Sequence, residues 1–233
     1  MALLLALDTA TRCCSVVLCD GARVLAFREE ESERLTHAER LNVFIGEVLR
    51  EAGVAFAQLE AVAVGIGPGS YTGLRIGLSA AKGLCYALRI PIIGMGTLDI
   101  LVRELLARNM QLTVGDLLMP MIDARRMEVF TRVADSSGGP LGGSHPLVLD
   151  EAWADALEAG SRAVVFGDGA DKASALWAGR TNVLHVPGIR PSHRGLAICA
   201  DEAFGHQAFG DLAYLVPDYG KPANVTQPRK TGT

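Results

Sequence analysis

Two aspartates are the residues of this 233-residue sequence best placed for chemistry. Asp8 ends an apolar run near the N-terminus, with Thr9 and Thr11 beside it, and Asp123 ends a second such run. A carboxylate at the end of a strand can orient a hydrated Mg²⁺ ion, and hydroxyl groups can contact phosphates. Asp8 has no glycine beside it and two arginines follow Asp123, so an approaching phosphate would be crowded. The pattern predicts a degenerate, weakly binding nucleotide site.

A glycine-rich stretch at 65–73 joins a strand-like run to a helix-like run. Glycines let backbone N–H groups approach an anion at a helix N-terminus, where the dipole also favours negative charge. The candidate phosphate-facing residues are Gly67, Gly69, Ser70, Gly167 and Gly169. A P-loop is excluded because no Gly-Lys-Ser/Thr follows, and the dinucleotide fingerprint lacks its third glycine and its acidic residue. An actin-like ATPase site and a tight turn without ligand stay open as alternatives.

The sequence indicates no catalytic residue and no metal site. The five histidines show neither H-x-x-x-H nor H-E-x-x-H spacing. His37, in the first turn of a predicted helix, is interpreted as an exposed polar residue. Ser70 lacks the G-x-S-x-G context of a nucleophile elbow. The five cysteines form no C-x-x-C pair and read as buried thiols in a reducing compartment.

The order of apolar patterns predicts a duplicated α/β fold. The first hundred residues read as three strands followed by alternating helices and strands. The scheme restarts at 118–122, after a lapse in periodicity. We therefore expect two lobes of the β-β-β-α-β-α type, an N-terminal lobe at 1–108 and a C-terminal lobe at 109–216. An extended tail at 217–233 follows.

Two predicted helices, at 37–52 and about 74–88, are candidates for a partner interface. Their apolar or small residues recur at helical spacing, and packing on the chain's own sheet accounts for one face of each helix. Phe44 and Val48 widen the first stripe, so that a partner helix could cover the surplus. The candidate interface residues are Leu41, Phe44, Ile45, Val48, Gly73, Gly77 and Ala81.

Composition narrows the function classes. The formal net charge is -4 and no run of basic residues is present, so any contact with tRNA is expected to be indirect. No apolar run approaches the roughly 18 residues that span a membrane. The apolar N-terminus lacks the positive region of a signal peptide, which predicts a cytoplasmic protein.

Several segments carry a family resemblance. Residues 5–11, 63–77 and 120–126 resemble the bacterial TsaB family of tRNA threonylcarbamoyladenosine biosynthesis proteins. Shorter matches at 167–169 and 213–217 follow in the same order. The resemblance is close up to residue 130 and thinner beyond.

This resemblance implies an actin-like ATPase fold (ASKHA, RNase H-like) in two lobes. It implies a non-catalytic paralogue of the threonylcarbamoyl transferase TsaD, lacking that enzyme's histidine pair, which dimerises with the transferase through its N-terminal helices. The small ATPase TsaE would join the pair, and threonylcarbamoyl-adenylate would be the donor. No cofactor is required, although weak ATP or ADP binding and a homodimer of the free chain fit the same resemblance. A stand-alone ATPase or a glycoprotease-like peptidase is the alternative function.

Overall fold

The first half of the chain builds one five-stranded mixed sheet. The structure, a computed structural model, describes residues 2–32 and 37–221. The sheet has the order β3-β2-β1-β4-β5. Its strands are β1 (Leu3–Asp8), β2 (Cys13–Asp20), β3 (Arg23–Glu31), β4 (Ala61–Gly67) and β5 (Ile92–Gly96). β1 pairs antiparallel with β2 through a short hairpin and parallel with β4, which it reaches through a helical crossover.

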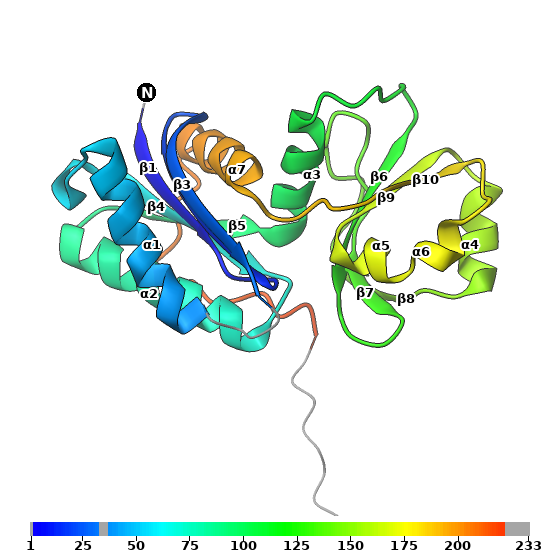
Figure 1. The fold of residues 1–233 in the computed structure, drawn as a ribbon, viewed down its shortest axis with the longest axis horizontal. Coiled ribbons are helices and arrows are strands. Elements are labelled where there is room, and N and C mark those ends of the chain that lie inside the picture. Colours follow the sequence, from blue (N-terminus) through cyan, green and yellow to red (C-terminus); the bar gives the residue numbers. More distant parts are fainter. Residues whose placement is uncertain (1, 33–36, 222–233) are drawn as a thin grey trace, which may run out of the picture.

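A second sheet repeats this topology in a second lobe beside the first (Figure 1). Read in the same direction, its order is β8-β7-β6-β9-β10. Its strands are β6 (Leu117–Asp123), β7 (Glu128–Thr131), β8 (His145–Val148), β9 (Ala163–Phe166) and β10 (Val183–Val186). β6 again pairs antiparallel with its hairpin partner and parallel with the strand after the crossover. The predicted duplication is confirmed at the level of topology.

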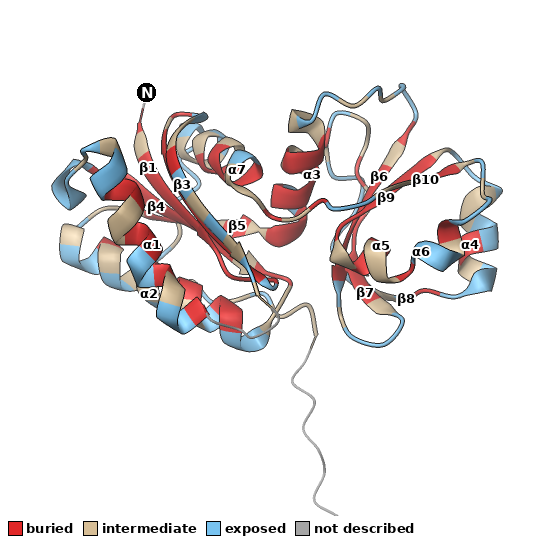
Figure 2. Cartoon of the chain, viewed as in Figure 1, coloured by how far each residue is buried: buried red, intermediate tan, exposed pale blue. Residues whose placement is uncertain are grey.

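Helices cover both faces of the sheets. They are α1 (His37–Ala52), α2 (Tyr71–Leu88), α3 (Thr97–Ala107), α4 (Glu151–Glu158), α5 (Asp168–Lys172), α6 (Ser174–Trp177) and α7 (His193–Gly205), with a 3₁₀ turn at Phe56–Gln58. Buried residues follow the central strands and the helix faces turned toward them (Figure 2). α1 and α2 cover one face of the first sheet, because apolar residues recur at helical spacing on their inner sides. None of the described helices combines the length and apolar composition that a membrane span requires.

The last helix of each repeat is exchanged between the lobes. Leu101 and Leu105 of α3 belong to the apolar core of the second sheet. Leu196 and Ala200 of α7 belong to the core on the outer face of the first sheet. A division of the chain at residue 108 therefore separates the two sheets, but it separates α7 from the first sheet on which it packs, and α3 packs on both sheets, with Ile100 in the core of the first.

The chain after α7 returns along the first lobe. The amide of Gly210 donates a 2.8 Å hydrogen bond to the carbonyl oxygen of Ile92, at the edge of the first sheet. The strap then crosses to the second lobe, where Lys221 forms an ion pair with Glu128. Of the predicted tail at 217–233, residues 217–221 form the end of this strap, and the rest lies outside the described residues.

Candidate functional site

The turn between β4 and α2, which carries the glycine-rich stretch, packs directly on the β1–β2 hairpin. A Cβ atom on Gly73 would stand 2.0 Å from the carbonyl oxygen of Thr9, and one on Gly69 would stand 2.3 Å from that of Ala10. Cβ atoms essentially never approach other atoms to less than 3.0 Å. Both positions therefore need glycine so that the hairpin can lie this close. The close approach of two backbone segments is the physical reason for the motif.

The polar groups of this turn are engaged within the chain. The Ser70 amide donates a 2.7 Å hydrogen bond to the carbonyl oxygen of Ala10. Thr9 Oγ1 donates a 2.7 Å hydrogen bond to the carbonyl oxygen of Gly73. Ser70 Oγ caps α2 by accepting a 3.3 Å hydrogen bond from the Gly73 amide. The hairpin and the cap thus take the hydrogen-bonding groups that a phosphate would need here.

The remaining predicted glycines serve similar close approaches. A Cβ atom on Gly67 would stand 2.0 Å from the carbonyl oxygen of Asp218 in the C-terminal strap. In the second lobe, a Cβ atom on Gly167 would stand 2.3 Å from the carbonyl oxygen of Met121. Gly169 follows in the same turn and also packs on Met121. Both lobes therefore use a glycine turn to seat the first strand of the repeat.

Asp8 was expected to face the cleft between the lobes, and this expectation is wrong. Its side chain is fully buried behind the hairpin. Oδ2 accepts a 3.2 Å hydrogen bond from the Ala10 amide, whereas Oδ1 has no partner among the described residues. Burial raises the pKa of Asp8 to about 7, because a charge there loses its hydration. The carboxylate of Asp8 is therefore not exposed to the space between the lobes.

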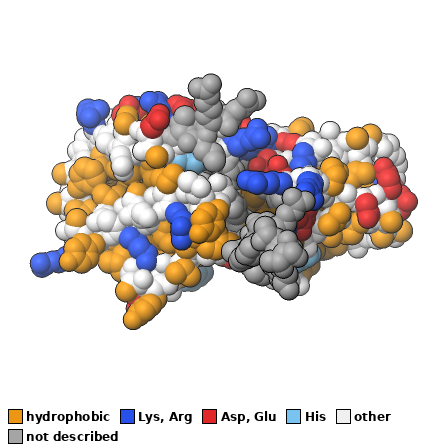
Figure 3. All heavy atoms as spheres, turned by 90° about the horizontal axis from the view of Figure 1, so that it is seen from below, with side chains coloured by type: hydrophobic (Ala, Val, Ile, Leu, Met, Phe, Trp, Pro, Cys, Tyr) orange, Lys and Arg blue, Asp and Glu red, His pale blue; other side chains and the backbone are white. Residues whose placement is uncertain are grey.

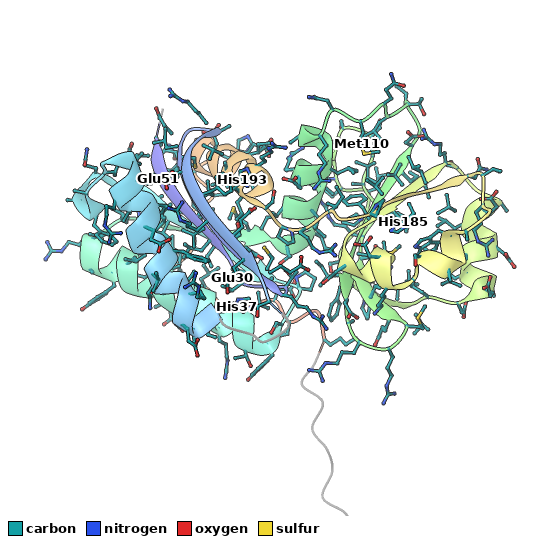
Figure 4. All side chains as sticks on the ribbon, viewed as in Figure 1. Glu30, His37, Glu51, Met110, His185 and His193 are labelled. Atoms are coloured by element: carbon teal, nitrogen blue, oxygen red, sulfur yellow. The ribbon has the colours of Figure 1, made fainter. Side chains whose placement is uncertain are left out.

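His37 is also buried, contrary to the prediction of an exposed residue. Its Nε2 lies 2.9 Å from the carbonyl oxygen of Thr11, which joins the start of α1 to the β1–β2 hairpin. Burial lowers the pKa of His37 below its usual value. Figure 4 shows His37, His185 and His193 on three separate elements, α1, β10 and α7. Within the described residues, no cluster of three or more His, Cys, Asp or Glu side chains could hold a metal ion.

A cavity of about 240 Å³ lies between the two hairpins. It is lined by Thr11, Arg12, Glu31, Asp123, Asp168, Lys172 and Arg190. Of the predicted nucleotide-facing residues, Thr11 and Asp123 line this cavity, whereas Asp8 and Thr9 are buried behind the hairpin. The arginines after Asp123 were expected to crowd this space, but Lys172 and Arg190, which are distant in sequence, fill that role instead.

Two of the cations that line this cavity are paired with carboxylates. Lys172 forms an ion pair with Asp123. Arg190 forms ion pairs with Asp171 at 2.7 Å and with Glu31 of the first lobe at 3.5 Å. These pairs engage two of the three cationic side chains that line the cavity, and Arg12 is the third.

The inter-lobe cavity is small for an adenine nucleotide. Small-molecule pockets usually measure about 300–1,000 Å³, and the inter-lobe cavity is smaller. Asp168 Oδ1 accepts a 2.9 Å hydrogen bond from the amide of Asp123, and burial raises the pKa of Asp168. The glycine turns are filled by the chain's own backbone.

The predicted interface residues of α1 and α2 lie inside the first lobe. Phe44 and Val48 are 2% and 0% exposed and pack on the sheet. The other members of the set, Leu41, Ile45, Gly73, Gly77 and Ala81, are also buried. The expectation that Phe44 and Val48 extend the stripe beyond the sheet is therefore wrong, because the sheet covers the full width of the stripe.

The outer sides of the same helices form a groove of about 590 Å³. It is lined by Ala38, Leu41, Asn42, Tyr71, Thr72, Arg75, Ile76, Ser79 and Ala80. Only Leu41 in this set belongs to the predicted interface. Further along the helices stand Gly46 and Gly83, and nothing lies within 4 Å of the Cβ position of either. Glycine disfavours a helix, so Gly46 and Gly83 inside predicted helices were a sequence signal for this outer face. The prediction of the interface used only the stripes of apolar or small residues and did not consider them.

Comparison with known proteins decides the family. The family model for TsaD, tRNA N6-adenosine threonylcarbamoyltransferase, matches residues 30–152. The Bacillus subtilis tRNA threonylcarbamoyladenosine biosynthesis protein TsaB is 32% identical over 165 residues, which cover 70% of this chain and 69% of that protein. The chain belongs to the TsaB family. The Escherichia coli TsaB protein is 35% identical over 127 residues, or 54% of this chain and 52% of that protein, so the chain spans about half the length of this TsaB relative.

Solved structures of TsaB-type proteins share the fold. A structure named YeaZ from Pseudomonas aeruginosa superimposes with a TM-score of 0.75 and 28% identity, covering 94% of this chain and all of the other. A polyphosphate/ATP-glucomannokinase from Arthrobacter matches with a TM-score of 0.51 and 13% identity over 88% of this chain and all of that one, which indicates a shared fold alone. This TsaB family member therefore has the duplicated actin-like ATPase fold predicted from its sequence.

Proposed function

We propose that this chain is a non-catalytic subunit of the complex that makes threonylcarbamoyladenosine in tRNA. In that complex it pairs with the transferase TsaD through the outer faces of α1 and α2. The observation that carries the proposal is the groove between these helices, continued by two open glycines. The TsaD family model covers residues 30–152, which contain both helices. A transferase of that family is therefore expected to present a related helix pair.

Two related helix pairs can meet around a two-fold axis as a four-helix bundle. Glycine inside a helix costs about 1 kcal/mol relative to alanine. Gly46 and Gly83 have open space at their Cβ positions, so no contact within the described residues explains that cost. Close approach of a partner helix explains it, because small residues let two helix backbones come together.

The interior of the first lobe supports a non-catalytic role. Ser70 Oγ is used as a helix cap. Burial raises the pKa of Cys85 to about 11, which disfavours the nucleophilic thiolate. Asp8 is buried, and Lys172 and Arg190 of the inter-lobe cavity are paired with carboxylates. These observations favour a scaffold over the alternatives of a stand-alone ATPase or a peptidase.

The other partners follow from the same proposal. A TsaE-type ATPase joins the pair, and the free chain forms a homodimer through the groove when the transferase is absent. The chain works without a cofactor of its own, and its five free cysteines suit the reducing cytoplasm.

The test is a matched pair of substitutions at Gly83, read by size-exclusion chromatography with a TsaD transferase from the same source. Gly83→Ala adds one methyl group and should keep the complex. Gly83→Gln should fold equally well by circular dichroism, yet bind the transferase at least about tenfold more weakly, because a long side chain blocks close helix approach. A Gly83→Gln chain that pairs like the unaltered protein would show that the transferase docks elsewhere.

A further inference from the structure

Three arginines on the first hairpins of the two lobes have no partner within the described residues. Arg12 lies between β1 and β2, and Arg125 and Arg126 lie between β6 and β7. All three are exposed, and their guanidinium groups form no ion pair or hydrogen bond with any other described residue. The neighbouring cations Lys172 and Arg190, by contrast, are paired with carboxylates.

The two hairpins lie on either side of the cavity between the lobes. Arg12 lines that cavity together with Asp123. Asp123 Oδ1 accepts a 2.7 Å hydrogen bond from the amide of Arg125, which anchors the second hairpin to the same place. Viewed from below, Lys and Arg side chains gather where the lobes meet, with Asp and Glu side chains among them, whereas the first lobe beside them is mainly apolar or uncharged (Figure 3).

The backbone of the second hairpin is strained at both arginines. Arg125 has φ 73° and Arg126 has φ 51°, so two consecutive residues with side chains adopt the left-handed conformation. This conformation costs roughly 1–2 kcal/mol per residue for most side chains, and asparagine and glycine reduce that cost. The turn is otherwise regular, because the amide of Ala124 donates to the carbonyl oxygen of Glu128 at 3.0 Å. A role for the two side chains themselves explains why arginine stands there.

We propose that Arg12, Arg125 and Arg126 form a surface that binds the phosphate backbone of RNA, which we name the hairpin arginine surface. The guanidinium group donates two parallel hydrogen bonds that match phosphate oxygens. The arginines lie on two separate hairpins, so they suit a polymer that carries a negative charge at regular intervals. Identification of the RNA as tRNA rests on the proposed function. The surface revises the expectation that tRNA is contacted only through a partner.

An acidic protein segment is the competing ligand, and the structure favours RNA over it. Stable protein interfaces centre on a buried apolar patch from which charge is depleted. Among the residues of the second hairpin tip, only Met127 offers a large exposed apolar side chain. The surface therefore presents charge with little apolar area around it.

The contact is expected to be weak in isolation and strongly dependent on salt. The net charge of the chain is -4, so the three arginines form a locally positive surface on a protein that is negative as a whole. Each phosphate neutralised lowers the slope of log K against log salt by about 0.7–0.9. Three contacts predict a slope of about -2 to -3 for the hairpin arginine surface.

The experiment measures fluorescence anisotropy of a labelled tRNA transcript with the full chain at several salt concentrations. Arg125→Asn with Arg126→Gly installs the residues that this turn prefers, so the melting temperature should stay equal or rise. RNA affinity should fall at least about fivefold, and the salt slope should become shallower by about 2. Adding Arg12→Ala should remove most of the remaining slope. Arg23→Ala, at the opposite end of the first sheet, is the control and should change neither quantity.

Equal RNA affinity of the triple variant and the unaltered chain, or no RNA binding by the unaltered chain, would overturn the proposal. If the triple variant keeps its RNA affinity but no longer pairs with the transferase, the arginines contact a protein, and the proposal would also be overturned. Measuring the pairing of the same proteins with the transferase separates this proposal from the proposed function. If arginine-dependent RNA binding is present but the unaltered chain does not pair with the transferase, only the proposed function fails.

Discussion

Thr9 Oγ1 lies 2.7 Å from the carbonyl oxygen of Gly73 and donates a hydrogen bond to it, although 64 residues separate them in the chain. Both residues are buried, and the contact joins the first hairpin to the first turn of α2. The hydrogen bond forms at this distance because Gly73 has no Cβ atom, which would stand 2.0 Å from the Thr9 carbonyl oxygen. The glycine motif therefore sets the position of the hairpin without any ligand.

Gly73→Ala should destabilise the fold. The new methyl group must displace the hairpin, and overpacking of this kind costs typically about 1–3 kcal/mol. Gly46→Ala is the matched control, since nothing lies within 4 Å of its Cβ position. The control should stabilise the chain by up to about 1 kcal/mol through helix propensity. Urea unfolding measures both, and equal effects of the two substitutions would contradict the packing argument.

Asp8 should make the chain less stable as pH rises toward neutrality. Its folded pKa is about 7 against an ordinary value of 3.8, so between these values the folded state holds a proton that the unfolded state has released. Stability therefore falls with rising pH across this window and levels off above about pH 7. Three pKa units correspond to about 4 kcal/mol.

Asp8→Asn removes this titration, and urea unfolding from pH 5 to 8 measures the change. The difference between the two proteins isolates Asp8, because Asp168 and His37 titrate in both. The stability of the unaltered chain relative to the variant should decline steadily as pH rises. A difference that is independent of pH would mean that Asp8 stays ionised in the folded protein.

Phe44 and Ile76 should behave differently, because Phe44 is fully buried in the core whereas Ile76 is half-buried at its margin and also lines the groove. Phe44→Ala empties a core site and should cost about 3–5 kcal/mol of stability. Ile76→Glu changes a half-buried residue of the groove and should leave the fold largely intact while it weakens pairing with the transferase. Thermal unfolding and size-exclusion chromatography distinguish them. A folded Phe44→Ala chain with impaired pairing would restore the inner stripe as the interface.

Millimolar ATP with Mg²⁺ should not raise the melting temperature, because the cavity between the lobes is small and two of its three cationic side chains are already paired with carboxylates. A ligand at a hundred times its Kd would stabilise the chain by about 2.7 kcal/mol. Differential scanning fluorimetry with and without nucleotide provides the measurement. A rise of several degrees that disappears on Lys172→Ala would show that a nucleotide does enter the cleft.

The sequence by itself determined the order of elements in the first lobe, the duplication and the family. Apolar runs of period two and stripes of period 3.6 are local signals, so the first lobe could be read from neighbouring residues. In the second lobe, β8, α4 and β10 were not predicted. The glycine-rich turn after β4 was also predicted, because a strand that runs into glycines before a helix leaves few other conformations.

Only the tertiary structure decided what those elements face. Periodicity shows that Phe44 is buried, but it does not show which element buries it, and the chain's own sheet proved wide enough. The exchange of α3 and α7, and the sealing of Asp8 behind its hairpin, likewise depend on contacts between residues far apart in the chain. The free energy of burial depends on the area removed from water and not on the neighbour that covers it, so the sequence pattern is the same for either arrangement.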